Sequence, residues 1–162
     1  MDINQKWDLT TEAEKGYLAG IIDGEGCIHL EKYQQKGRPC ASYNLRIRVS
    51  MTDIQAPLFL YNKFGGNFYT YQSKNLKAKK TYIWQIVNSK GINFLRYIQP
   101  YLLVKKNQAD VALKFIATLY KPVRHIDGKF SRTRLDALDE REKLKQEMNF
   151  LNQRGIKEEV IQ

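Results

Sequence analysis

A chain of 162 residues is long enough to bury a hydrophobic core without disulfide or metal support, and we expect a single domain over residues 1–162. Its formal net charge of +10 disfavours an enzyme of neutral small molecules and favours a polyanionic partner, with nucleic acid the leading candidate. No apolar run approaches the length of a membrane span, and residues 1–7 lack the apolar stretch of a secretion signal. We therefore expect an intracellular protein with no membrane partner.

The first predicted element is a helix over residues 12–23 that opens with a capping box. The Thr11 hydroxyl accepts from a first-turn amide, while Glu14 reaches back to the cap. Small residues recur along this helix, namely Gly16, Gly20 and Gly24 at intervals of four, with Ala19 beside them. Each glycine costs a helix up to about 1 kcal/mol, so the row needs a compensating reason. Close approach of another helix supplies one.

After Gly26 the apolar residues alternate with period two, which predicts a β-hairpin with strands over residues 27–33 and 44–50. One face of these strands is polar, carrying His29, Glu31, Tyr33, Asn44, Arg46, Arg48 and Ser50. The two cysteines lack the spacing of a zinc cluster or a disulfide framework. We interpret Cys27 as a small buried residue and Cys40 as a loop residue.

A second helix follows, with Asp53 as its cap, Pro57 in its first turn and Gly65-Gly66 as its stop signal. Residues 67–73 and 81–87 form the second predicted hairpin around a lysine-rich tip. The sequence does not decide which face of the second strand is buried, because each face carries a set of apolar residues. The first set is Tyr82, Trp84 and Ile86, and the second is Ile83 and Val87.

The remaining chain is predicted to be helical over residues 89–97, 107–120 and 131–153. The element order of helix, hairpin, helix, hairpin and helices predicts an α+β fold with a four-stranded antiparallel sheet. The core covers residues 12–120, with a helical C-terminal extension over residues 121–162. Between residues 28 and 90 the acidic residues are Glu31 and Asp53 alone, whereas lysine and arginine are frequent. The excess positive charge therefore belongs to the sheet.

The segment Leu18-Ala19-Gly20-Ile21-Ile22-Asp23-Gly24-Glu25-Gly26 resembles the nine-residue signature of the LAGLIDADG homing endonucleases. Residues 100–109 look like the family's second landmark, and the resemblance spans residues 12–120. It implies an αββαββα core with a curved sheet that lies in the DNA major groove, and a metal-dependent enzyme that cuts both strands. Nothing like a second motif appears after residue 26, which places the chain in the single-motif homodimeric branch and predicts a nearly palindromic target.

The motif residues are the candidate active site. Small residues at Gly16, Ala19 and Gly20 would let two copies of the helix cross in near backbone contact, with Asp23 at the same interface in a structural role. The resemblance implies that the Glu25 carboxylate and the Gly24 carbonyl hold the metal, since hard cations prefer oxygen ligands. The expected ion is Mg²⁺ or Mn²⁺, while Ca²⁺ would bind without supporting efficient cleavage.

Lys105 matches the family's active-site lysine, which would stabilise charge on the phosphate or position the water. The alternative is a solvated lysine beside Lys106. The family's homodimeric members often carry a polar residue, frequently glutamine, after the second strand, and this chain has Ser50-Met51-Thr52 there. Methionine cannot order water, so Ser50 or Thr52 substitutes for it, or solvent alone holds the nucleophile.

A two-stranded ribbon fits the major groove, where each base pair shows a distinct pattern of donors and acceptors. We expect Arg48 to make a bidentate contact with guanine and the hairpin lysines to grip phosphates. The alternative for each single residue is a solvated sheet face. The predicted DNA-binding residues are His29, Glu31, Tyr33, Gln35, Arg46, Arg48, Asn67, Tyr69, Tyr71, Ser73, Lys79 and Lys80.

Two other functions compete with a homing endonuclease that acts on double-stranded DNA as a homodimer. One is an RNA maturase that assists intron splicing, for which intron RNA is the partner. The other is a DNA-binding regulator that kept the scaffold without cleavage; Glu25 argues against it, and Glu25 with Lys105 argues against the maturase. The expected compartment is a bacterial or archaeal cytoplasm, or a mitochondrion or chloroplast for an organelle-encoded protein.

Overall fold

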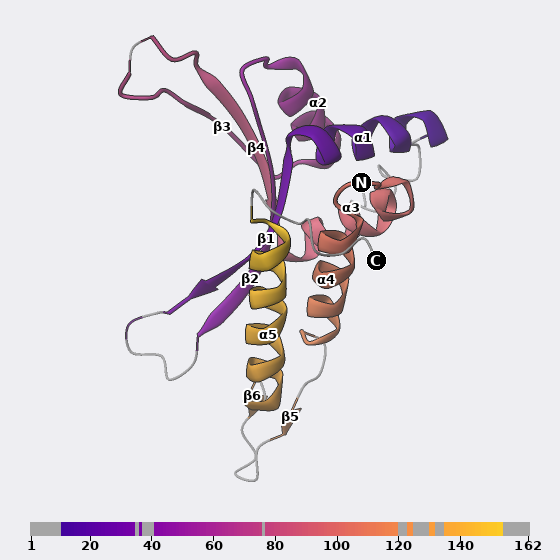
Figure 1. The fold of residues 1–162 in the computed structure, drawn as a ribbon, viewed down its shortest axis with the longest axis vertical. Coiled ribbons are helices and arrows are strands. Elements are labelled where there is room, and N and C mark those ends of the chain that lie inside the picture. The colour runs from indigo at the N-terminus through magenta and orange to yellow at the C-terminus, as the bar shows by residue number, and fades with distance from the viewer. Residues whose placement is uncertain are drawn as a thin grey trace, which may run out of the picture.

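The computed structural model describes residues 11–34, 36, 41–75, 77–119, 123–124, 130–131 and 135–153. Within these residues, five α-helices and six strands follow one another (Figure 1). The order is α1 (Glu12–Glu25), β1 (Gly26–Tyr33), β2 (Ser42–Met51), α2 (Gln55–Phe64), β3 (Asn67–Tyr71), β4 (Thr81–Val87), α3 (Asn88–Ile98), the 3-10 turn η2 (Gln99–Tyr101), α4 (Lys106–Ala117), β5 (Val123–Arg124), β6 (Phe130–Ser131) and α5 (Leu135–Leu151).

The main sheet is curved and antiparallel, with the strand order β1-β2-β4-β3. Both hairpins splay away from helices α1 to α4, which lie together beside the sheet (Figure 1). Because neighbouring residues of a strand point to opposite faces, one face packs on helices and the other stays open. The α+β fold expected from the sequence, with its four-stranded antiparallel sheet, is confirmed.

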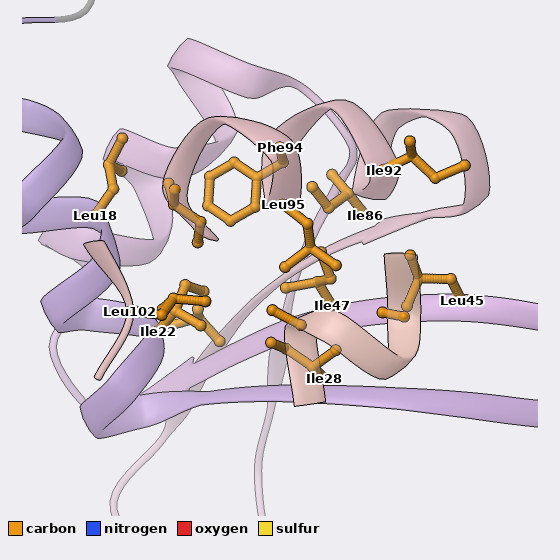
Figure 2. Close-up of a cluster of buried hydrophobic side chains, with 14 of the residues drawn as sticks. Leu18, Ile22, Ile28, Leu45, Ile47, Ile86, Ile92, Phe94, Leu95 and Leu102 are labelled. Atoms are coloured by element: carbon orange, nitrogen blue, oxygen red, sulfur yellow. The ribbon is translucent and has the colours of Figure 1, made fainter. Parts of the chain in front are cut away.

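The helix-covered face builds the hydrophobic core, in which side chains of β1, β2 and β4 meet those of α1 and α3 (Figure 2). Trp84 and Ile86 are buried on this side, which settles the face of β4 that the sequence left open. Ile83 lies on the open face yet is only 1% exposed. It is covered because β4 is an interior strand, with Ser50 of β2 and Tyr69 of β3 as its register partners.

Helix α5 belongs to the same core, to which it contributes Leu144 and Met148. Its buried Arg141 donates to the Thr118 hydroxyl at 2.9 Å and to the Thr118 carbonyl at 2.8 Å. At its C-terminal end Asn152 donates to the Ile28 carbonyl on edge strand β1 at 2.9 Å. The C-terminal extension therefore stabilises the edge of the sheet that follows the motif helix.

Most predicted helices and strands are confirmed, with shifted ends. The capping box of α1 is present, with both the Thr11 and the Glu14 hydrogen bonds, and α1 continues two residues past the expected end at residue 23. Asp53 accepts from the Gln55 amide at 2.7 Å but precedes the residue at the N-cap, which is Ile54. The short β5–β6 hairpin was not predicted, and α5 begins later than residue 131.

Two further features bear on these expectations. Cys27 is exposed on the open face rather than buried, because the strand alternation that places Ile28 in the core places Cys27 on the opposite face. Cys40 lies outside the described residues. Among the helices that the structure describes, none combines the length and the apolar character needed to traverse a bilayer.

Candidate functional site

The C-terminal end of α1 is fixed to a turn that lies 80 residues further along the chain. One carboxylate oxygen of Asp23 accepts from the Leu103 amide at 2.8 Å, and the other accepts from the Lys105 amide at 2.9 Å. In return, the Lys105 ammonium donates to the main-chain carbonyl of Asp23. Lys105 is therefore held at the end of the motif helix.

Glu25 is the last residue of α1, and its side chain is exposed beside the equally exposed Gly24. A helix C-terminus carries partial negative charge on its unpaired carbonyls, so a carboxylate added there forms an oxygen-rich, electronegative point. Hard divalent cations take such ligands. Gly24 and Glu25 therefore fit a metal chemically.

One chain supplies only part of a metal coordination shell. Within the described ranges, no three His, Cys, Asp or Glu residues come together as a metal-binding group. Further oxygen ligands would have to come from a second copy of α1, from water or from a bound phosphate. Among the described residues, the exposed carboxylate at this helix end is that of Glu25.

The glycine row of α1 is exposed along one side of the helix. A methyl group added at Gly16, Gly20 or Gly24 would meet no atom of the described chain within 4 Å, apart from the helix itself and the adjoining residues. Ala19, which we expected on the same surface, is instead 1% exposed and packed in the core. Its position in the helix directs it toward the sheet, so the prediction that it lines a dimer interface is corrected.

Asp23 is half-buried, and both of its carboxylate oxygens are engaged inside the subunit. Its structural role at the helix end is therefore visible within one chain. Its proximity to a second subunit remains a prediction.

The open face of the sheet collects most of the predicted DNA-binding residues. Strand parity and register bring polar side chains of three strands to one surface: His29, Glu31 and Tyr33 from β1, Arg46 and Arg48 from β2, and Asn67, Tyr69 and Tyr71 from β3. Ser73 follows the end of β3, and Lys79 and Lys80 are exposed in the β3–β4 hairpin. Gln35 lies outside the described residues.

Arg46 contacts side chains of both neighbouring strands on the open face. Its Nη2 lies 2.7 Å from Glu31 Oε2, and its Nη1 donates to Gln85 Oε1 at 3.1 Å. Its Nε is buried with no hydrogen-bond partner among the described residues. Arg46 is thus held within the sheet rather than extended toward a ligand.

His29 lies beside the same ion pair, with its Nε2 3.3 Å from Glu31 Oε1. Burial lowers the pKa of the His29 imidazole, and this outweighs the opposite effect of Glu31; the positive charges of Arg46 and Arg48 lower it further. His29 is therefore neutral at neutral pH, and its ring can donate from one nitrogen and accept at the other.

Arg48 differs from Arg46, since its Nε donates to Ser50 Oγ at 2.9 Å and its terminal nitrogens take no partner in the described part of the chain. A guanidinium fixed at one end and open at the other suits bidentate recognition. Met51 packs against the core, and Thr52 is exposed just beyond the strand. Of the Ser50-Met51-Thr52 segment, the two polar residues alone are placed to contact solvent on this side.

Sequence reasoning missed Gln85, which occupies the middle of the open face between Arg48 and Asn67. It accepts from both Arg46 and, at 3.2 Å, the Tyr69 hydroxyl. Gln85 could be found only by knowing which residues of β4 lie on the open face. The apolar Ile83, which lies on that face, obscured this in the sequence. The strand order would have resolved it.

Comparisons with known proteins bear on the whole arrangement. The sequence model of a family described as LAGLIDADG endonuclease matches residues 18–116, which include the nine-residue motif, the four-stranded sheet and Lys105. No curated protein matches the chain.

Several solved structures share the fold. The homing endonuclease I-CvuI, crystallised with DNA in the presence of Mg or Ca, matches with a TM-score of 0.69 and 19% identity, over 90% of this chain and 85% of that one. The archaeal intron-encoded homing endonuclease I-Vdi141I, complexed with DNA, matches with a TM-score of 0.69 and 18% identity, over 91% and 89%. The homing endonuclease I-TnaI matches with a TM-score of 0.64 and 17% identity, over 83% and 87%.

Proposed function

Because the chain belongs to the LAGLIDADG endonuclease family, we propose that it is a homing endonuclease that makes metal-dependent double-strand breaks in a long, nearly palindromic DNA target as a homodimer. The observation that carries this proposal is the end of α1, where an exposed Glu25 lies at the same helix terminus that Lys105 contacts. An acid and a cation at one point are suited to phosphodiester hydrolysis.

Each residue of this point has a separate task. Glu25 and the Gly24 carbonyl would hold a divalent ion, Mg²⁺ or Mn²⁺, which would supply charge neutralisation and an activated water. Lys105 offers an ammonium to the negative charge that develops on the phosphate. Asp23 keeps Lys105 in place through its two main-chain hydrogen bonds, so it acts as a positioning residue.

Two features of the single chain support the proposed homodimer. A duplex has two phosphodiesters to cut, and the described residues of one chain supply one exposed acid at the end of α1. The exposed row of Gly16, Gly20 and Gly24 allows a second α1 to approach closely. Two-fold pairing along this row would bring two Glu25 side chains side by side and require a nearly palindromic site.

The open face of the sheet is proposed to read the major groove. It carries a free-ended guanidinium in Arg48 and hydroxyls in Tyr69 and Tyr71, which recognise base edges, while Lys79 and Lys80 meet phosphates. The formal net charge of +10 agrees with a protein that displaces counterions from DNA.

The experiment that tests this function is cleavage of a plasmid that carries a selected target, with Mg²⁺, by the parent and by Glu25→Gln. We expect the variant to retain target binding and to cleave on the order of 1000-fold more slowly, since a metal ligand contributes several kcal/mol to the barrier. Equal cleavage by the variant would show that the catalytic assignment is wrong. Binding without cleavage by the parent would identify a regulator.

A further inference from the structure

Gln85 lies at the centre of the open face and has no role in the contacts proposed so far for cleavage or DNA recognition. It belongs to β4, the strand between β2 and β3, and its register partners are Arg48 and Asn67. Its side chain is half-buried. A residue at this position meets any duplex that lies along the open face.

The amide of Gln85 is held in one orientation. Its Oε1 accepts from Arg46 Nη1 at 3.1 Å and from the Tyr69 hydroxyl at 3.2 Å. A guanidinium has donors only, so the amide oxygen, and not the NH₂ group, must face Arg46. Arg46 in turn forms an ion pair at 2.7 Å with Glu31, on the neighbouring edge strand β1.

These contacts form a chain of hydrogen bonds across all four strands, from Glu31 to Arg46, Gln85 and Tyr69. With its oxygen used twice, Gln85 has only the Nε2 donors left, and no described residue accepts from them. A glutamine that reads adenine in a bidentate manner needs both its oxygen and its nitrogen, which this arrangement denies.

We propose that Gln85 is a specificity-determining residue that reads one base of the target as a fixed hydrogen-bond donor, with Arg46 and Tyr69 as its positioning residues. The proposal rests on the proposed function, since it requires duplex DNA on the open face. Guanine N7 and adenine N7 both accept in the major groove, so the discrimination lies at the exocyclic group of the base. A donor placed opposite that group selects the keto bases, because guanine O6 and thymine O4 accept there. It disfavours the amino groups of cytosine and adenine, which donate there.

The sharpest variant is Gln85→Glu, because a carboxylate still accepts from Arg46 and Tyr69 but presents an acceptor outward. The parent and the variant, both in the non-cleaving Glu25→Gln background, would be allowed to select duplexes from a library with a randomised half-site. At one base position the parent is expected to select guanine or thymine. The variant should switch that position to cytosine or adenine, with a change in preference of about tenfold.

Gln55→Glu makes the same chemical change at an exposed position in the first turn of α2 and is the matched control. It should leave the selected sequence unchanged. Arg46→Met frees the amide to rotate, so the keto preference at that position should collapse while other positions keep theirs. Circular dichroism of each variant verifies that it is folded.

Two results would contradict the inference in distinguishable ways. If the parent selects a defined sequence but Gln85→Glu leaves every position unchanged, Gln85 does not determine specificity, and the proposed function stands. If the parent enriches no sequence at all, the DNA-recognition function itself is wrong, and the inference fails with it.

Discussion

The end of α1 and the open face of the sheet hold their polar residues by different kinds of contact. At the helix end, Asp23 accepts from two main-chain amides, and Lys105 donates to a main-chain carbonyl. On the open face, Arg46 is held by the side chains of Glu31 and Gln85. Main-chain partners persist whatever residue is present, whereas side-chain partners change with substitution. Substitutions on the open face, the proposed reading surface, should therefore leave the geometry of the proposed active site at the end of α1 unchanged.

The largest effect is expected from Gly20→Leu, which tests whether cleavage requires a second α1 packed against the glycine row. The added side chain meets no atom of the described subunit beyond the helix and adjoining residues, but it would keep a second helix away. We expect cleavage to be lost and the protein to run as a monomer in analytical ultracentrifugation. The free energy of unfolding of the monomer should rise by about 0.5 to 1 kcal/mol, since leucine favours helix over glycine.

Gly26→Ala is the contrasting variant. A methyl group there would lie 2.6 Å from the Ile22 carbonyl oxygen and 2.7 Å from the Ile22 Cα, so α1 and β1 would have to separate. It should destabilise the fold itself. A dimeric, active Gly20→Leu protein would refute the proposed pairing.

The next largest effect is expected from Lys105→Met, which removes the charge at the helix end and leaves both Asp23 hydrogen bonds to main-chain amides in place. Cleavage should slow by about 100-fold with target binding retained, because an electrostatic stabiliser of the transition state is lost. Lys106→Met is the matched control, since Lys106 is exposed at the start of α4. Equal slowing by both variants in single-turnover assays would contradict a specific role for Lys105.

A smaller effect is expected on the open face, where Arg48→Ala should cost about 1 to 3 kcal/mol of binding free energy at particular base pairs. Lys79→Ala should weaken binding uniformly across sequences and reduce its salt dependence, as a lost phosphate contact does. Competition binding against single-base target variants measures both. Equal loss at every base pair for Arg48→Ala would remove it from direct readout.

The smallest effect concerns His29, whose ordinary pKa of 6.5 is lowered in the folded protein chiefly by burial. The unfolded chain therefore takes up the proton first, so the stability that neutral His29 contributes is complete above pH 6.5 and is lost as the pH falls below it. His29→Gln should flatten this part of the unfolding profile. Urea titrations across that pH range measure it, and an unchanged slope would contradict the assignment.

Local patterns made much of the fold predictable. The capping box, the period-two strands and the motif are each contained in a short window, so the helix, both hairpins and Glu25 could be placed from the sequence. Ala19 could not, because the side of α1 that faces the sheet depends on how the helix packs. Parity in β4 was hidden by Ile83, which is apolar on the open face of an interior strand.

The features that could not be predicted from the sequence are contacts between distant segments of the chain. The contacts of Asp23 with residues 103 and 105 depend on the placement of η2 and α4, and no spacing in the sequence predicts them. The bond from Arg46 to Gln85 depends on the pairing of β2 with β4, which are separated by a helix and a strand. Apart from Gln85, the residues proposed to read DNA could be named from the sequence, whereas the hydrogen bonds between them required the register.

Asn152 of the C-terminal segment, which donates to the Ile28 carbonyl, also bears on how the protein behaves in concentrated solution. β1 is an edge strand, and an uncovered edge is a template on which strands of other molecules can add. Helix α5 closes off this side of β1 near the motif. A chain shortened before α5 should therefore associate through β1, with light scattering rising as its concentration increases, while the full chain stays dispersed.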